Sequence, residues 1–137
     1  MIYRLSYLRS RAASAENPAA APGAGGKAGG GLKGAPAIKD FQPGQTAVLF
    51  EQDGPGCIRH IWLTSHRRDP LTLRNLVLRA HWEGSEAPNV AVPLSDFFGV
   101  AHGATVPMYS DLVLMQEGRG FNCYIPMPFG KSGRRGR

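Results

Sequence analysis

The stretch Cys57-Ile58-Arg59-His60-Ile61-Trp62-Leu63-Thr64 has the alternation that decides the fold class. Successive side chains of a β-strand point to opposite faces, so a half-buried strand alternates between residues that pack and residues that meet solvent or a partner. His60 and Trp62 fall on one face of this stretch, and Ile61 and Leu63 fall on the other. The alternation predicts a strand with two chemically different faces.

Similar short runs recur along residues 41–129. In the run Leu73–Trp82, Leu78 and Ala80 are opposed by Arg79. Turn-forming residues separate the runs, and the chain holds 18 glycines and 11 prolines, about twice ordinary usage, which argues against a helical bundle. We therefore predict an all-β, antiparallel β-sandwich. Its expected strands are Thr46–Glu51, Cys57–Thr64, Leu73–Trp82, Asn89–Pro93, Asp111–Gln116 and Gly120–Ile125.

Three segments differ in composition. Residues 1–40 form an N-terminal segment whose Gly/Ala/Pro-rich part, 12–37, has too few large apolar side chains to offset its ordering entropy. On composition alone, this part is a flexible linker or a loop. Residues 41–129 hold the strand-rich domain, and residues 130–137 form a basic Gly/Arg tail without apolar alternation.

The net charge of +6 comes from the two ends of the chain, because residues 40–130 hold six basic and nine acidic side chains. A basic tail is usually a solvated feature, so we expect no nucleic-acid partner. Residues 1–14 lack the apolar run of a signal peptide, and no stretch is long enough to span a bilayer. These features predict a cytoplasmic protein without a membrane partner, unless a misassigned start hides a leader.

Histidine and cysteine spacing gives no sign of a metal centre. None of the four histidines stands at a recognised ligand spacing, and none is near either cysteine. We therefore expect no metal and no cofactor. Cys57 and Cys123 are interpreted as two buried thiols, with a disulfide as the alternative.

Asp96 is the acidic residue with the most suggestive neighbours. It precedes Phe97 and Phe98, and His102 follows shortly after. An acid beside paired aromatic rings and a histidine offers both stacking and hydrogen bonding to a sugar. The structural alternative is an aspartate that caps a local turn over a buried phenylalanine pair.

The last expected strand, Gly120–Ile125, offers a second candidate. Asn122 and Tyr124 share one of its faces and present an amide and a phenol, which suit the recognition of hydroxyl groups. The alternative is an ordinary edge strand that ends at Pro126.

Three blocks of sequence follow one another along the chain. They are Asp53-Gly54-Pro55-Gly56-Cys57-Ile58-Arg59-His60-Ile61-Trp62, Pro93-Leu94-Ser95-Asp96-Phe97-Phe98-Gly99 and Phe121-Asn122-Cys123-Tyr124-Ile125-Pro126-Met127-Pro128-Phe129. In this order they resemble glycoside hydrolase family 172, formerly a domain of unknown function. The resemblance runs from about Ser14 to Phe129, because Ser14-Ala15-Glu16-Asn17-Pro18 and the glycine-rich stretch also resemble the family's opening loop.

The resemblance implies a jelly-roll protomer within a larger polypeptide of two jelly rolls. It implies assembly into homo-trimers or hexamers and activity on furanosides, such as fructofuranose or arabinofuranose units. It also implies that the opening segment folds back near the substrate pocket. The candidate substrate-binding residues are therefore Glu16, Asn17, Asp96, Phe98, His102, Asn122 and Tyr124.

The sequence departs from the family after Phe129, where relatives continue through further strands and a second jelly roll. The resemblance places the family's catalytic glutamate pair in that later portion, so no catalytic residue is assigned here. We expect an incomplete jelly roll, ended by a truncation or frameshift, that forms the N-terminal fragment of a furanoside-acting hydrolase and is inactive alone. The alternative is a non-catalytic jelly-roll module for oligomer assembly or carbohydrate binding.

Overall fold

The structure, a computed structural model, describes residues 7–28, 34 and 36–135. Contacts divide the chain into two units, Met1–Phe50 and Glu51–Arg137. The second unit carries nearly all of the secondary structure. None of the helices in the described part is long and apolar enough to cross a lipid bilayer.

Strands dominate the second unit, and its helices are short. The helices are α1 (Pro70–Asn75), α2 (Leu94–Phe97) and the 3-10 helix η2 (Ala101–Gly103). The strands are β1 (Phe50–Asp53), β2 (Gly56–Ile58), β3 (Ile61–Leu63), β4 (Val77–Trp82), β5 (Val90–Pro93), β6 (Met108–Tyr109), β7 (Val113–Gln116), β8 (Gly120–Cys123), β9 (Met127–Phe129) and β10 (Ser132–Arg135).

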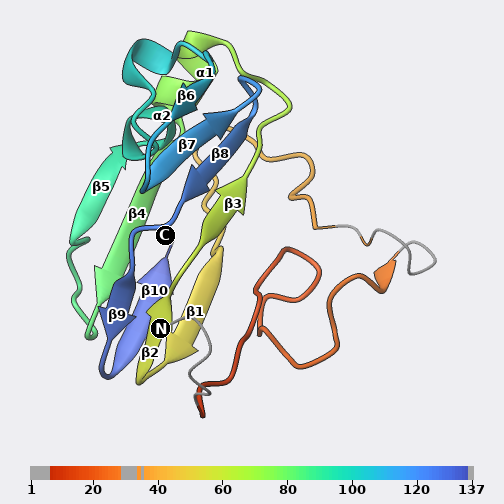
Figure 1. Ribbon diagram of the computed structural model, residues 1–137, viewed down its shortest axis with the longest axis vertical. Helices are drawn as coiled ribbons and strands as arrows, with labels where there is room; N and C mark the ends of the chain where they lie inside the picture. Colours follow the sequence, from red (N-terminus) through yellow and green to blue (C-terminus); the bar gives the residue numbers. More distant parts are fainter. Residues whose placement is uncertain (1–6, 29–33, 35, 136–137) are drawn as a thin grey trace. The chain divides into compact units, whose positions relative to one another are not determined.

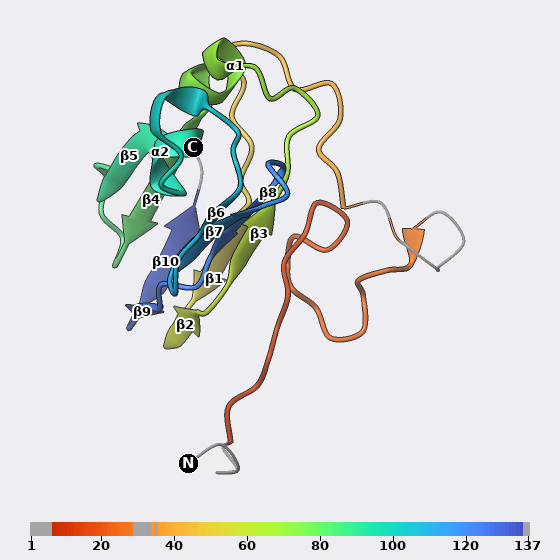
Figure 2. The same ribbon diagram turned by 45° about the horizontal axis from the view of Figure 1, so that its top comes forward.

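The strands form two four-stranded sheets and one pair. The sheet orders are β1-β10-β4-β5 and β3-β8-β7-β6, and β2 pairs with β9. The registered pairings are antiparallel. The two larger sheets lie in separate layers, with α1 and α2 together at one end of them, at the top of Figure 1 (Figures 1 and 2). The all-β, antiparallel sandwich predicted from the sequence is therefore confirmed.

Alternation along β4 and β8 builds the core. Leu78 and Ala80 of β4 are buried, as are Phe121 and Cys123 of β8, whereas Arg79 lies exposed between its buried neighbours. These are the faces that the sequence pattern predicted. The buried apolar residues of the second unit are Leu73, Leu78, Ala80, Leu94, Phe98, Val100, Met115, Phe121, Cys123 and Phe129.

The predicted strand at residues 57–64 is divided between two sheets. Its first part is β2, which pairs with β9, and its second part is β3, which pairs with β8. Arg59 and His60 lie between the two strands, where the chain passes from one sheet to the other. His60 therefore occupies a corner rather than a strand interior.

The predicted strand at residues 73–82 is wrong in its first part. Residues 70–75 form α1 because Asp69 caps the helix and Pro70 stands at its start, where the missing amide hydrogen costs nothing. The Asp69 carboxylate accepts hydrogen bonds from the Thr72 backbone N–H at 2.9 Å and from the Thr72 hydroxyl at 2.7 Å. Local capping therefore overrides the apolar strand pattern until β4 begins at Val77.

Residues that the composition suggested to be a basic tail include a strand. Within 130–137, Ser132–Arg135 forms β10, whose neighbours in the sheet are β1 and β4. Gly133 pairs with Trp82, Arg134 with His81 and Arg135 with Ala80. Backbone hydrogen bonds can define such a strand without any apolar alternation, which is why the sequence pattern does not reveal it.

The cysteine prediction is half correct. Cys123 is a buried free thiol, whereas Cys57 is a free thiol that lies exposed on β2. Cys57 belongs to the two-stranded pair of β2 and β9, where its register partner is Pro128.

Candidate functional site

One face of the β3-β8-β7-β6 sheet lies in the core, and the opposite face, which we call the outer face, carries aromatic and polar side chains. The register places Trp62 beside Asn122, Asn122 beside Leu114, and Leu114 beside Tyr109. Trp62 and Tyr109 are 56% and 69% exposed, whereas Asn122 is only 4% exposed. Exposed aromatic rings gathered on a sheet face are typical of a binding surface.

Three side chains on this face make specific contacts. His60 and Tyr124 are the next pair along the register of β3 and β8. Their rings are stacked, with centroids 4.3 Å apart and planes 4° apart. The Nε2 atom of His60 lies 3.0 Å from Oδ1 of Asn122, and Nδ2 of Asn122 donates to the Gly120 carbonyl at 3.2 Å. Together with Trp62, these residues form what we call the outer-face cluster: His60, Trp62, Asn122 and Tyr124.

Asp96 and His102 lie in the helical end of the sandwich. Asp96 stands in the first turn of α2, and its carboxylate accepts hydrogen bonds from Arg74 of α1 at 3.2 Å and from the Ser95 hydroxyl at 3.1 Å. His102 is exposed in η2 and has a left-handed backbone, with φ of 58°. The Arg74 contact links α1 to α2, so Asp96 serves at least to hold these short helices together.

Phe98 lies in the core rather than on a surface. It has no exposed area, and its ring packs against Phe97 with centroids 5.1 Å apart and against Phe121 with centroids 5.4 Å apart. A ring without exposed surface is in no position to touch a ligand in this conformation. The contacts therefore agree with the alternative interpretation of the sequence, in which Phe98 is a buried core residue.

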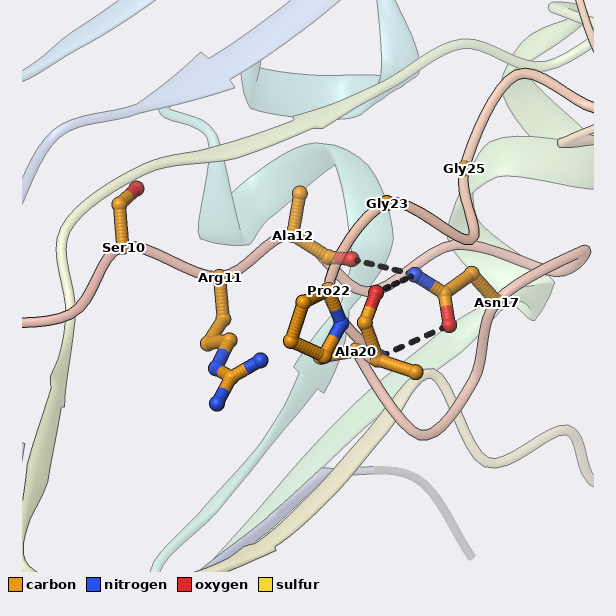
Figure 3. A pocket seen from close by; sticks show the side chains of 9 residues that line it. Ser10, Arg11, Ala12, Asn17, Ala20, Pro22, Gly23 and Gly25 are labelled. Atoms are coloured by element: carbon orange, nitrogen blue, oxygen red, sulfur yellow. Dashed lines mark hydrogen bonds between the residues drawn. The ribbon is translucent and has the colours of Figure 1, made fainter.

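Asn17, in the first unit, closes a loop with its side chain. Nδ2 donates to the carbonyls of Ala12 at 3.4 Å and Ala21 at 3.1 Å, and Oδ1 accepts from the Ala21 N–H at 3.0 Å (Figure 3). The amide is thus engaged at both ends. It borders a small open hollow of about 160 Å³, which is lined by Ser10, Arg11, Ala12, Asn17, Ala20, Ala21, Pro22, Gly23 and Gly25.

Glu16 organises the same loop through its carboxylate. The carboxylate accepts from the backbone N–H groups of Gly26 at 2.8 Å and Ala28 at 3.3 Å. Gly34 lies against it so closely that a Cβ atom there would meet the carboxylate, and Gly34 has a φ of +72°. In the described part of the Gly/Ala/Pro-rich segment, residues 12–28, 34 and 36–37, the chain thus makes polar contacts of its own.

The carboxylates of Glu16, Asp69, Glu83 and Asp96 make contacts within the chain, and those of Asp69 and Glu83 have lowered pKa values. The Thr72 hydroxyl and then the Thr72 N–H lower the pKa of Asp69, and the N–H groups of Gly130 and Lys131 lower the pKa of Glu83. A glycosidase acid needs a raised pKa, because it must hold a proton until the leaving oxygen takes it. Asp69 and Glu83 are therefore unsuited to that role.

Six of the seven sequence-predicted residues fall into three groups, and the seventh, Phe98, lies in the core. Asn122 and Tyr124 meet at His60, Asp96 and His102 share the helical end, and Glu16 and Asn17 belong to the first unit. Within the described residues, no hydrogen bond, ion pair or ring contact joins the second group to the first. The same residues contain no group of three or more His, Cys, Asp and Glu side chains that could hold a metal ion.

Sequence reasoning missed His60, Trp62 and Arg74 as members of these groups. The alternation already placed His60 and Trp62 on one face, but the pairing of that face with Asn122 and Tyr124 depends on the register of β3 and β8. Arg74 was missed because it fell inside the predicted strand Leu73–Trp82, whereas the structure places it in α1.

Two comparisons with known proteins bear on this chain. A family model described as GH172 domain-like matches residues 36–135, which is well over half of the sequence. No curated protein matches the chain. The matched range includes both larger sheets and ends with β10.

Proposed function

Because the chain belongs to the GH172 domain-like family, a glycoside hydrolase-related family, we propose that it recognises a furanoside through the outer-face cluster. The observation that carries the proposal is the combination of exposed rings with a nearly buried amide on one sheet face. Trp62 and Tyr124 are 56% and 43% exposed beside Asn122. Rings supply apolar surface for the C–H face of a sugar, while the phenol and indole supply hydrogen-bonding groups for its hydroxyls.

Four of the ten carboxylates are engaged in ways that disfavour a role in bond cleavage. Hydrolysis of a glycosidic bond generally needs one carboxylic acid and one carboxylate across the scissile bond. Glu16, Asp69, Glu83 and Asp96 are each engaged in contacts that organise the chain, as described above. We propose that the chain binds fructofuranosyl or arabinofuranosyl units without releasing free sugar.

The test is binding of arabinofuranosyl and fructofuranosyl oligosaccharides to the full chain, measured by calorimetry and by tryptophan fluorescence, to which Trp62 and Trp82 both contribute. Trp62→Ala should weaken binding by about tenfold or more, because a covered aromatic ring contributes ~1.5–3 kcal/mol. Leu71→Ala is the matched control, since Leu71 is 72% exposed on α1. Equal affinity for a glucopyranosyl oligosaccharide would contradict the furanoside preference, and rapid release of free sugar would contradict the recognition-only role.

A second candidate function is oligomer assembly, without catalysis. Exposed apolar side chains also occur outside the cluster: Leu112, Val106 and Tyr109 are 52%, 56% and 69% exposed. A trimer or hexamer would cover such side chains at an interface. Sedimentation of the wild-type chain and of Leu112→Glu separates the two functions: assembly predicts an oligomer that Leu112→Glu dissociates, whereas recognition alone predicts a monomer that binds sugar.

A further inference from the structure

The amide of Asn122 can have only one orientation. Nδ2 lies 3.2 Å from the Gly120 carbonyl oxygen, and Oδ1 lies 3.0 Å from Nε2 of His60. Exchanging the two ends of the amide would place Oδ1 against the Gly120 carbonyl, where two acceptors would face each other without a proton. Asn122 is 4% exposed, so water has little access to relieve that conflict.

This orientation determines which nitrogen of His60 carries the proton. An amide oxygen only accepts hydrogen bonds, so Nε2 must donate to it. In a neutral imidazole the other nitrogen is then an acceptor, and Nδ1 of His60 presents a lone pair. No hydrogen-bond partner for Nδ1 occurs among residues 7–28, 34 and 36–135, and His60 is exposed.

Tyr124 fixes the direction of that lone pair. The imidazole lies flat on the phenol ring, with planes 4° apart and centroids separated by 4.3 Å. The ring plane is set by this stacking, and the rotation within the plane is set by the bond from Nε2 to Asn122. This acceptor is held in two ways and has no partner among the described residues, so it is ready to receive a donor from a ligand.

We propose that His60 is a sugar-binding residue whose Nδ1 accepts a hydrogen bond from a hydroxyl group of the ligand on the outer face. The inference rests on the proposed function, and it adds His60 to the binding residues with its proton on Nε2. A neutral sugar fits because its hydroxyls are donors, whereas a phosphate or carboxylate ligand would offer only acceptors to the lone pair. Asn122 acts as the positioning residue, since its amide sets the tautomer of His60.

The first experiment observes the tautomer in the full chain, without any ligand. Nitrogen-15 spectra of the imidazole rings at about pH 8.5, where ordinary histidines are neutral, should show His60 protonated at Nε2. His81 is an internal control of the opposite kind, because its Nδ1 lies 3.0 Å from the Ser85 carbonyl and must donate to it. Its Nε2 is buried without a partner among the described residues, as suits a nitrogen without a proton. A His60 ring protonated at Nδ1 would overturn the inference.

The second experiment titrates the same sample with an arabinofuranosyl and then a fructofuranosyl oligosaccharide. Binding should shift the Nδ1 resonance of His60 and leave the resonances of His81 unchanged. His60→Phe keeps a flat ring on Tyr124 but removes both nitrogens, and it should raise the Kd about fivefold to tenfold, the effect of one lost hydrogen bond. His66→Phe, which replaces an exposed histidine outside the cluster, should leave the Kd unchanged.

The outcomes separate this inference from the function on which it rests. Absence of sugar binding by the wild-type chain overturns both. Binding that leaves the Nδ1 resonance of His60 in place overturns the role of His60 alone and keeps the proposed function, as does an unchanged Kd in a folded His60→Phe. The Nδ1 shift is measured on the wild-type chain, so it decides the question even where His60→Phe does not fold.

Discussion

Phe98 shows how one residue type serves either a core or a sugar site. The ring has no exposed area and contacts Phe121 of β8, so its loss should leave a cavity where α2 meets the sheet. We expect Phe98→Ala to lower the free energy of unfolding by about 3–5 kcal/mol. Urea unfolding measures this loss, and Tyr109→Ala, which truncates a 69% exposed ring, should change stability by less than about 0.5 kcal/mol. A stable Phe98→Ala with weakened sugar binding would instead return Phe98 to the binding site.

Glu83 is a second residue whose role follows from its partners. Its carboxylate accepts from the N–H of Gly130 at 2.7 Å and of Lys131 at 2.8 Å, which joins the turn after β4 to the turn before β10. These two bonds, that of Gly130 first, lower the pKa of Glu83 below its ordinary value of 4.5. The charged carboxylate therefore stabilises the fold fully above pH 4.5, and this contribution disappears as the pH falls through the lowered pKa.

Glu83→Gln should thus make the melting temperature of the protein less dependent on pH in the acidic range. At pH 7 the variant should melt a few degrees below the wild type, because the neutral amide is a weaker acceptor for two N–H groups. As the pH falls from 4.5 through the lowered pKa, the two melting temperatures should converge, since the carboxyl of the folded wild type loses its charge in that range. Thermal unfolding across this range is the measurement, with Glu86→Gln in the same hairpin as the control. A constant difference at all pH values would exclude the proposed role.

At the scale of elements, Gly103 joins η2 to α1. It has a φ of +69°, and a Cβ atom there would lie 2.8 Å from the Cα of Pro70. Gly84 also has a left-handed φ, of +77°, but a Cβ atom there would have nothing within 4 Å. Gly103→Ala should therefore cost about 2–4 kcal/mol, for backbone conformation and for the clash, whereas Gly84→Ala should cost only ~1 kcal/mol. Equal losses in urea unfolding would show that Pro70 moves aside freely.

Some of the secondary-structure elements could be predicted from the sequence alone, and others could not. β4 and β8 were predictable because each has a buried face that alternates with exposed or polar residues. The start of the helix α1 has a sequence signal in Asp69 and Pro70, but the apolar residues that follow also fit a strand, so its extent to Asn75 was not predicted. Six residues are too few for either periodicity to dominate, so the capping contacts decided the outcome.

The candidate site also contains residues that the sequence predicted and residues that only the structure revealed. Asn122 and Tyr124 were placed on one face by alternation alone, and the structure adds His60 and Trp62 through the register of β3 and β8. Register depends on which strands pair, and strand pairing across 62 residues of chain leaves no local sequence signal. Contacts between distant strands are therefore the part of a site that a single sequence reveals least.

At the scale of the whole molecule, β10 connects parts of the chain that lie far apart in sequence. It stands between β1 and β4, and the neighbouring Lys131 carbonyl accepts a hydrogen bond from the Gly54 N–H at 2.6 Å. A Cβ atom at Gly54 would lie 2.5 Å from the Gly130 carbonyl oxygen, so these two turns are packed closely. The C-terminal strand is thus part of the sandwich rather than an appendage to it.

Removing β10 should therefore damage the whole sandwich. A chain that ends at Lys131 leaves β1 and β4 with unpaired edges, which are prone to aggregation. We expect it to lose at least ~3 kcal/mol of stability, because β10 has three registered pairs with β4 and a net hydrogen bond contributes ~1 kcal/mol. Urea unfolding and light scattering measure both effects, and a chain that ends at Arg135 is the control, because it keeps all of β10. If the chain ending at Lys131 unfolded at the same urea concentration and stayed monodisperse, then β10 would be dispensable, and the sandwich would be completed by the remaining strands.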